Sequence, residues 1–195
     1  MFDLSDYRFD AIVFDCDGTL ADNMPLHYEA WKYGLEKNGA SFEVTPQMIL
    51  SNAGKGIHDI VGIFNREYGD HLDAGQVALA KDEYFEMHHH AIEPIPEVME
   101  VVNLYKGKVP MAVASGSRSK SVMRTLTHLG IAELFYPIVS VDDVKHGKPA
   151  PDMFLMAAEE MGIEPDRCLV FEDGELGIQA AEACGMPWIR VESRL

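Results

Sequence analysis

Short apolar runs recur along this chain of 195 residues, and longer amphipathic stretches separate them. The runs are rich in Val, Ile and Phe and contain few polar positions, which is typical of strands buried on both faces of a parallel sheet. They are AIVFD (11–15), VPMAVAS (109–115), YPIVSV (136–141), RCLVFE (167–172) and PWIRV (187–191). The pattern predicts that these runs are the strands of one sheet.

The stretches between the later runs have helical spacing and end in Gly, a residue that is common just beyond helix C-termini. They are SKSVMRTLTHLG (119–130), PDMFLMAAEEMG (151–162) and DGELGIQAAEACG (173–185). Strand and helix therefore alternate along this part of the chain. This alternation predicts a doubly wound, Rossmann-like α/β fold with a parallel sheet.

The connection between the first two predicted strands, from about Ala21 to Gly107, is much longer than one crossover helix requires. It contains three stretches with helical character, LHYEAWKYGLEKNG (26–39), IHDIVGIFNREYG (57–69) and AGQVALAKDEYFEMHHH (74–90). We interpret residues 23–90 as an inserted all-helical cap, and residues 1–22 with 91–195 as the α/β core. A cap inserted after the first strand would lie over the carboxyl edge of the sheet, where α/β sheets bind ligands.

Charge and composition narrow the possible partners. The 16 basic and 32 acidic residues give a net charge of −16 at pH 7, so we expect neither nucleic acid nor an anionic membrane as a partner. The N-terminal stretch lacks an apolar signal core and no run approaches membrane-spanning length, so a cytoplasmic protein is expected. Nothing in the sequence requires more than a monomer or a weak oligomer.

The cysteines lack metal-type spacing, and we expect Cys16, Cys168 and Cys184 to be reduced core thiols.

Polar residues follow four of the predicted strands. They are Asp15 and Asp17 after the first strand, Ser115 and Gly116 after the second, Lys148 after the third, and Glu172 and Asp173 after the fourth. Because the carboxyl ends of parallel strands meet at one edge of a sheet, we expect these groups to lie together.

The chemistry of this group of residues favours a metal ion and a phosphoryl group. The carboxylates would repel one another strongly unless a cation lay among them. Oxygen-only ligands favour a hard cation, and Mg²⁺ is bound by a few carboxylates together with water and substrate phosphate. Ser115, the backbone around Gly116, and Lys148 can bind phosphate oxygens. The sequence therefore predicts a Mg²⁺ site beside a phosphate cradle, an arrangement suited to phosphoryl transfer.

A carboxylate is the expected nucleophile. A Ser or Thr nucleophile would need a general base, whereas a carboxylate is already ionised at pH 7. Asp15, at the end of the first strand, can attack phosphorus and form an aspartyl-phosphate. Asp17, two residues further on, can protonate the leaving alcohol and then deprotonate the attacking water.

Four motifs, DCDGT (15–19), ASGS (114–117), GKPAPD (147–152) and FEDGELGIQAA (171–181), occur in the order and spacing of the haloacid dehalogenase superfamily. The chain most resembles the β-phosphoglucomutase-like subgroup, which includes phosphatases of fructose 1-phosphate and related sugar phosphates. The resemblance implies that Asp15 is nucleophile and metal ligand, and that Asp17 is the acid/base, with its carbonyl on Mg²⁺. It also implies that Ser115 and Lys148 bind the phosphoryl group and that Asp173, beside Glu172, completes the metal site.

The chain departs from this family pattern in places. Gly174 stands where relatives often have Ser, and the loop SNAGKGIHDI (51–60) resembles the family's substrate loop only loosely. Mutases of the subgroup bind a second phosphate with an arginine, and this chain has no clear equivalent of that arginine. Lys55 is the nearest cation. His27 and Trp31, one helical turn apart, are candidates for packing in the cap or for substrate contact.

The expected function is that of a Mg²⁺-dependent phosphatase acting on a small phosphorylated metabolite, with a sugar phosphate similar to fructose 1-phosphate as the expected substrate. Two alternatives stay open. A β-phosphoglucomutase would use the same phospho-aspartate but conserve the phosphate, and a non-catalytic signalling module would keep the phospho-aspartate as a switch. Asp17 argues against the signalling module, because an acid/base group beside the phospho-aspartate would hasten its hydrolysis.

Overall fold

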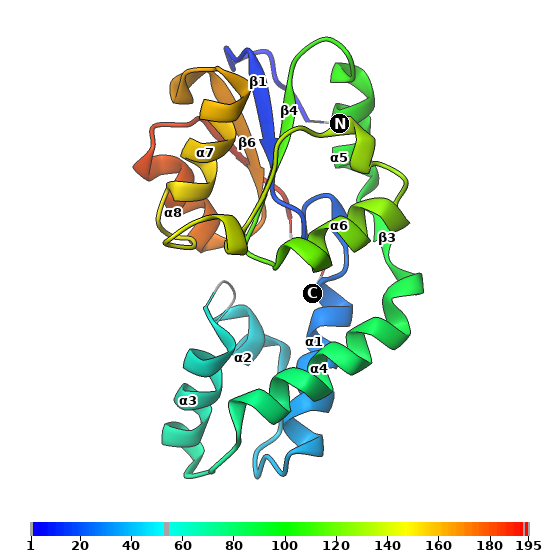
Figure 1. The fold of residues 1–195 in the computed structure, drawn as a ribbon, viewed down its shortest axis with the longest axis vertical. Helices are drawn as coiled ribbons and strands as arrows, with labels where there is room; N and C mark the ends of the chain where they lie inside the picture. Colours follow the sequence, from blue (N-terminus) through cyan, green and yellow to red (C-terminus); the bar gives the residue numbers. More distant parts are fainter. Residues whose placement is uncertain (1, 53–54, 193, 195) are drawn as a thin grey trace. The chain divides into compact units, whose positions relative to one another are not determined.

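The computed structural model describes residues 2–52, 55–192 and 194. The chain divides into two compact units (Figure 1). The α/β unit is formed by Met1–Asp22 and Glu93–Arg194, and the helical unit by Asn23–Ile92.

The α/β unit contains one five-stranded sheet whose strands all run parallel, in the order β5-β4-β1-β6-β7. The strands are β1 (Ala11–Phe14), β4 (Met111–Ser115), β5 (Ile138–Ser140), β6 (Cys168–Glu172) and β7 (Trp188–Arg190). Each lies within one of the apolar runs of the sequence. The predicted doubly wound α/β fold with a parallel sheet is confirmed.

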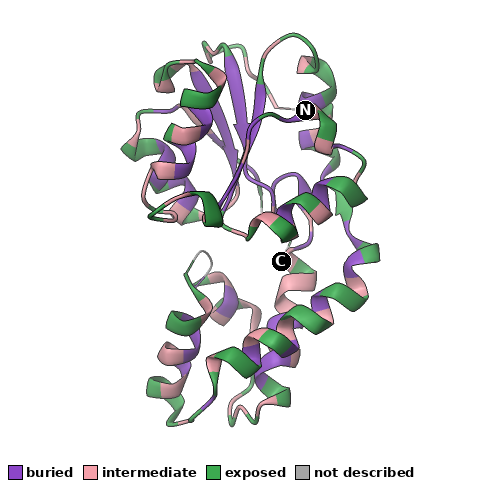
Figure 2. Cartoon of the chain, in the orientation of Figure 1, coloured by how far each residue is buried: buried purple, intermediate pink, exposed green. Residues whose placement is uncertain are grey.

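Helices cover both faces of the sheet, as Figure 1 shows. The side chains of a strand point to alternate faces, so the central strand β1 contributes to two cores. Ile12 and Phe14 pack on one face with α5 and α6, while Ala11 and Val13 pack on the other with α7 and α8. All four side chains are fully buried, and every residue of the three central strands β1, β4 and β6 is buried, as the purple colour in Figure 2 shows. The helices are α5 (Pro96–Tyr105), α6 (Ser119–His128), α7 (Asp152–Met161) and α8 (Glu175–Ala183).

A two-stranded antiparallel ladder joins the segments where the chain leaves and re-enters the α/β unit. Its strands are β2 (Ala21–Asp22) and β3 (Glu93–Pro94). No pattern in the sequence indicates these two strands, because two residues are too few to show strand periodicity. Short 3₁₀ turns lie in the connections of the same unit: η2 (Ala132–Leu134), η3 (Val141–Asp143) and η4 (Pro165–Arg167).

The helical unit has its own apolar core, to which Leu35, Phe64 and Val77 contribute. Gly34 lets α1 and α4 approach closely, since a Cβ at this position would lie 2.9 Å from the carbonyl oxygen of Val77. The elements of this unit are α1 (Met24–Lys37), α2 (Pro46–Leu50), α3 (Ile57–Tyr68), α4 (Ala74–His88) and η1 (His89–Ala91).

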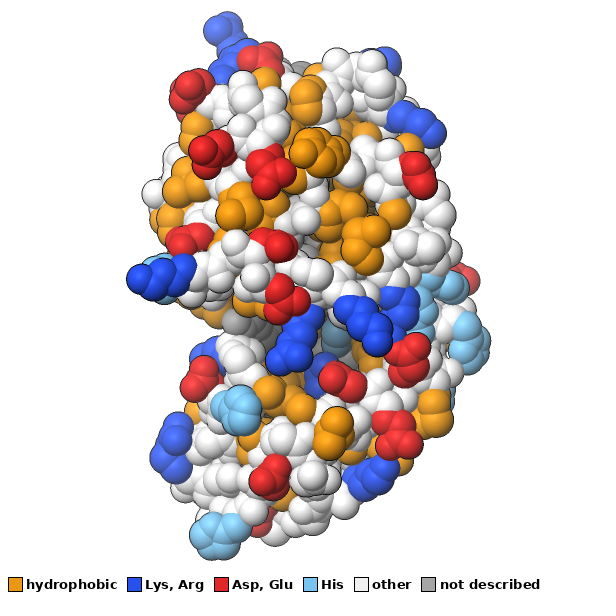
Figure 3. Space-filling view, in the orientation of Figure 1, with side chains coloured by type: hydrophobic (Ala, Val, Ile, Leu, Met, Phe, Trp, Pro, Cys, Tyr) orange, Lys and Arg blue, Asp and Glu red, His pale blue; other side chains and the backbone are white. Residues whose placement is uncertain are grey.

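The surface of the described residues and the three cysteines show no unusual feature. Among the described residues, no helix has the length and apolar character needed to cross a bilayer. The acidic side chains on the face of the α/β unit in Figure 3 are spread singly rather than gathered in one patch. Cys16 and Cys168 are buried, Cys184 is half-buried, and all three are free thiols.

Candidate active site

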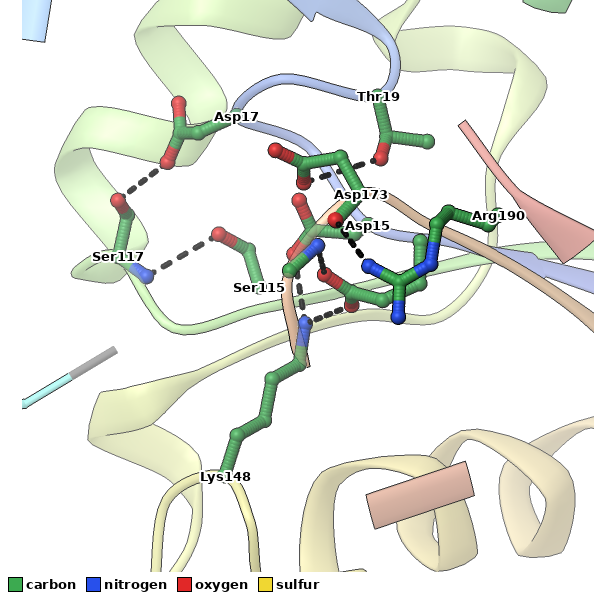
Figure 4. A network of polar contacts seen from close by, with 10 residues as sticks. Asp15, Asp17, Thr19, Ser115, Ser117, Lys148, Asp173 and Arg190 are labelled. Carbon is green, nitrogen blue, oxygen red and sulfur yellow. Dashed lines mark hydrogen bonds and ion pairs between the residues drawn. The ribbon is translucent and has the colours of Figure 1, made fainter. Parts of the chain in front are cut away.

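The order of the strands brings the predicted site residues to one edge of the sheet. Strand β1 lies between β4 and β6, so Asp15, the residue that follows β1, lies beside the ends of both neighbours. The Asp15 N–H donates to the carbonyl oxygen of Phe171 at 2.9 Å, which extends the ladder by one step. Ser115 is the last residue of β4 and Glu172 the last of β6, and both are buried. The side chains of this edge are drawn in Figure 4.

Lys148 reaches into the edge from the loop between η3 and α7. Its Nζ lies 2.6 Å from Asp15 Oδ1 and 2.7 Å from Glu172 Oε2. The ammonium group also lies over the ring of Phe154, 5.2 Å from the ring centroid. A charge as deeply buried as this is costly unless it is paired and hydrogen-bonded. The three charged groups therefore hold one another in a fixed arrangement.

Glu172 accepts hydrogen bonds at both of its carboxylate oxygens. Lys148 donates to Oε2, and the N–H of Gly174 donates to Oε1 at 3.0 Å. Gly177, in the first turn of α8, leaves space for the Glu172 carboxylate. A Cβ at residue 177 would lie 2.1 Å from both Cδ and Oε2 of Glu172. The glycine thus permits the position from which Glu172 contacts Lys148.

Asp173 is held by two residues that the sequence analysis did not select. The hydroxyl of Thr19, which is fully buried, donates to Asp173 Oδ1 at 3.5 Å, and Arg190 Nη1 donates to the Asp173 carbonyl oxygen at 3.2 Å. Thr19 lies in the DCDGT motif, which could have drawn attention to it. Its partner lies 154 positions away, and no local pattern in the sequence indicates that pairing.

Three carboxylates could hold a metal ion together. One oxygen from each of Asp15, Glu172 and Asp173 lies within 4.8 Å of the other two. This donor set consists of oxygen alone, which is the set that hard cations such as Mg²⁺ prefer.

The electrostatics of the site indicate a deficit of positive charge. Burial raises the pKa of Asp15 well above its usual value, and Glu172 adds to the rise, whereas Lys148 opposes it. Burial and Glu172 likewise raise the pKa of Asp173 to about 7. For Lys148, burial alone would lower the pKa, but the two carboxylates beside it outweigh burial and raise it. A divalent cation among these carboxylates would supply the missing charge.

Asp17 points toward the loop between β4 and α6. Its Oδ2 accepts a hydrogen bond from the hydroxyl of Ser117, and the Ser117 N–H donates to Ser115 Oγ at 3.1 Å (Figure 4). Gly116, between the two serines, is exposed, with open space where a Cβ would lie. Ser117 belongs to the ASGS motif, but the sequence analysis did not give it a role.

The candidate residues of the helical unit have partners within that unit. Trp31 is buried in its core, and Lys81 Nζ lies 5.7 Å from the centroid of its ring. The ring of His27 packs on that of Phe85, with 4.6 Å between centroids. Lys55 donates to Asn52 Oδ1 at 2.8 Å. These contacts of Trp31, His27 and Lys55 therefore lie within the helical unit.

The chain belongs to the haloacid dehalogenase-like hydrolases, because residues 9–185 match the model of that family. It is 39% identical over 185 residues to the fructose-1-phosphate phosphatase YqaB of Escherichia coli K12, covering 94% of this chain and 97% of that protein. It is 26% identical over 180 residues to the phosphorylated carbohydrates phosphatase of Thermotoga maritima, covering 91% and 82% of the two proteins.

Similarity to solved structures agrees with this membership. A Thermotoga maritima structure named as a β-phosphoglucomutase superposes with a TM-score of 0.72 at 26% identity, covering 96% of this chain and 87% of that one. The resemblance stated from the sequence motifs, both to the superfamily and to its β-phosphoglucomutase-like subgroup, is confirmed.

Proposed function

We propose that this protein is a Mg²⁺-dependent phosphatase that hydrolyses a sugar phosphate similar to fructose 1-phosphate through an aspartyl-phosphate on Asp15. The enzyme class, a hydrolase of phosphoric monoesters, follows from the family and from the phosphatases to which the chain is similar. The observation that carries the finer proposal is the position of Asp15, which contacts Lys148 and shares an oxygen cluster with Glu172 and Asp173.

The residues at the sheet edge fit a Mg²⁺ ion. Oxygens of Asp15, Asp173 and Glu172 would hold it, together with the backbone carbonyl of Asp17. The raised pKa values of Asp15 and Asp173 support this assignment, because buried carboxylates crowded together favour protonation until a cation joins them. When bound, the ion would neutralise charge on the phosphate and keep the carboxylates ionised.

The chemistry has two steps, each with a role for residues of this chain. In the first step a carboxylate oxygen of Asp15 attacks phosphorus, the bond from phosphorus to the sugar oxygen breaks, and Asp17 gives that oxygen a proton. In the second step Asp17, now a carboxylate, takes a proton from water as the water oxygen attacks phosphorus. The bond between phosphorus and Asp15 then breaks, which releases phosphate and restores both side chains. Lys148 and Ser115 stabilise the charge on the phosphoryl oxygens.

The substrate class rests on the relatives. The Escherichia coli relative is named for fructose 1-phosphate and the Thermotoga maritima relative for phosphorylated carbohydrates. We further propose that residues 23–90 act as a cap that contributes substrate contacts, with His27, Trp31 and Lys55 as candidates for that role.

Phosphate release tests the proposal. The purified full chain is incubated with a panel of sugar phosphates that includes fructose 1-phosphate, with Mg²⁺ or with EDTA. We expect free phosphate with Mg²⁺, none with EDTA, and recovery when Mg²⁺ is returned. Asp15→Asn should lower kcat by about 1000-fold or more, as loss of a nucleophile does in other enzymes. Activity that is indifferent to chelation would remove the metal from the proposal, and a variant that kept a tenth of wild-type activity would remove Asp15 as nucleophile.

The same assay separates the phosphatase from the mutase. A phosphomutase conserves the phosphate, so it would convert a hexose phosphate into an isomer without releasing phosphate. Chromatography of the sugar phosphates alongside the phosphate assay detects that outcome. For a phosphatase, we expect the amount of sugar phosphate consumed to equal the amount of free phosphate released.

A further inference from the structure

Ser117 is linked to two parts of the candidate site at once. It lies in the loop between Ser115, the end of β4, and Ser119, the start of α6. Its hydroxyl donates to Asp17 Oδ2 and its N–H donates to Ser115 Oγ at 3.1 Å, as Figure 4 shows. One residue therefore contacts both the proposed acid/base and a proposed phosphate ligand.

The loop that carries Ser117 is anchored to the segment that follows β5. The carbonyl oxygen of Ser117 accepts from the N–H of Val141 at 3.2 Å. Two residues further on, the N–H of Ser119 donates to Asp142 Oδ2 at 3.0 Å. The hydroxyls of Ser119 and Ser140 also lie 2.6 Å apart. With its backbone fixed on both sides, Ser117 presents its hydroxyl from a rigid position, as a residue that orients a reacting group must.

We propose that Ser117 is a positioning residue that orients the carboxyl group of Asp17 for proton transfer to the leaving group. This inference rests on the proposed function, in which Asp17 is the acid/base. Because Oδ2 of Asp17 accepts the hydrogen bond from Ser117, the transferable proton is carried by Oδ1. The hydrogen bond thus fixes both the orientation of the carboxyl group and the oxygen that acts.

The N–H of Ser117 also orients the proposed phosphate ligand Ser115. Because Ser115 Oγ accepts the N–H of Ser117, its own hydroxyl proton is directed elsewhere and is available to a phosphoryl oxygen. The backbone of Ser117 serves the phosphate ligand, whereas only its side chain serves Asp17. Removing the hydroxyl therefore tests the Asp17 contact and leaves the Ser115 contact in place.

The need for a proton donor depends on the leaving group. When a sugar phosphate is cleaved, the bond from phosphorus to the ester oxygen breaks, the oxygen keeps the electron pair, and it takes the proton from Asp17. A p-nitrophenolate anion is stable near neutral pH, so p-nitrophenyl phosphate can lose it without a proton. A fault in the orientation of Asp17 will therefore slow the sugar phosphate much more than the aryl phosphate.

The test compares wild type with Ser117→Ala, Ser117→Thr, Asp17→Asn and Ser121→Ala. Ser121 lies on α6 outside the site and serves as the matched control. For each protein, kcat/KM is measured with Mg²⁺ on the sugar phosphate cleaved fastest by wild type and on p-nitrophenyl phosphate. Ser117→Ala should lose about 10- to 100-fold on the sugar phosphate, a part of the 10²- to 10⁴-fold supplied by a positioned acid/base. It should lose less than about threefold on p-nitrophenyl phosphate, because departure of that group needs little protonation.

The controls make each outcome decisive. Ser117→Thr, which keeps a hydroxyl, should restore most of the sugar phosphate activity, and Ser121→Ala should match wild type on both substrates. If Ser117→Ala matches wild type or loses equally on both substrates while Asp17→Asn shows the selective loss, the inference is overturned and the proposed function stands. If Asp17→Asn itself shows no selective loss, the acid/base assignment fails, and the inference fails with it.

Discussion

Glu172 occupies the space beside Gly177 that a side chain at that position would need. A Cβ on residue 177 would lie 2.1 Å from the Cδ and Oε2 atoms of Glu172, and Oε2 is the oxygen that contacts Lys148. Gly177 on α8 is thus coupled to Lys148, the charged group beside Asp15, because Glu172 lies against the one and contacts the other.

Gly177→Ala should therefore impair activity without unfolding the protein. The new methyl group would force the Glu172 carboxylate away from Lys148, and we expect kcat to fall about tenfold or more. Alanine favours the helix by about 1 kcal/mol, which offsets part of the cost of overpacking. Steady-state kinetics and thermal unfolding would measure the two effects.

The matched control for this substitution is Gly62→Ala in α3, where a Cβ would meet only the flexible end of Arg66 at 3.3 Å. This variant should keep wild-type activity and equal or exceed wild-type stability. Full activity in Gly177→Ala would show that Glu172 can move without consequence for catalysis.

Lys148→Met should reduce both activity and stability. Without the ammonium group, two buried carboxylates would face each other unpaired, and breaking such a buried pair typically costs about 3–5 kcal/mol. We expect kcat/KM to fall by about 10²-fold or more, because the cation also stabilises the transferring phosphoryl group. Urea unfolding and phosphate release would measure the two effects.

Lys145→Met, which removes an exposed lysine from the same loop, is the control for Lys148→Met and should behave as wild type. Equal losses in the two variants would assign the effect to net charge rather than to the contacts of Lys148.

The stability of the metal-free protein should fall as the pH rises from about 4 to about 7, through the contribution of Asp173. Its pKa of about 7 lies above the ordinary value of 3.8, so in this interval the native state binds more protons than the unfolded state. The free energy of unfolding then declines with pH, and the contribution is lost as the pH passes the folded pKa. Thermal unfolding in EDTA across this pH range would measure the decline.

Two comparisons isolate this contribution. Asp173→Asn cannot titrate, so its stability should fall less steeply over the same range. Mg²⁺ should stabilise the wild-type protein more at pH 8 than at pH 5, because its binding to carboxylates competes with protons. A Mg²⁺ effect that was independent of pH would contradict the assignment of Asp173 to the metal site.

Thr19→Val should weaken the response to Mg²⁺. The substitution keeps the shape of a fully buried side chain but removes the hydroxyl that donates to Asp173. Groups that orient metal ligands typically contribute 10- to 100-fold to metal affinity, and a hydrogen bond of 3.5 Å is long, so we expect a loss of about three- to tenfold. The Mg²⁺ concentration that gives half-maximal activity measures it.

Thr127→Val, at an exposed position of α6, is the control for Thr19→Val and should leave the Mg²⁺ response unchanged. A Thr19→Val variant with the wild-type Mg²⁺ requirement would show that the hydroxyl has no part in holding Asp173.

Much of the fold could be predicted because its strands are buried on both faces. Such strands must be nearly continuous apolar runs, and these runs are visible without knowledge of the partners. The location of the candidate site at one edge of the sheet could be predicted for the same reason. Asp15, Ser115 and Glu172 end or follow neighbouring strands, and parallel strands bring such residues together whatever the loops do.

The remaining features depend on contacts between side chains that are distant in sequence. The pairing of Ser117 with Asp17 spans 100 positions and that of Thr19 with Asp173 spans 154. Neither leaves a periodic signal, because each depends on the direction of a single side chain. The role of Gly177 is equally hidden, because a glycine in a helix indicates close packing without naming the group that it accommodates.

The ladder of β2 and β3 has a consequence for how this architecture can change. Ala21 pairs with Pro94 and Asp22 with Glu93, so the ends of the intervening segment are adjacent backbone positions. Such a junction resembles the base of a hairpin, so the segment between the two strands can be replaced while the chain on either side keeps its path. The segment between the two strands can therefore change in sequence or length without displacing the strand end at Asp15 or the helix that begins at Pro96.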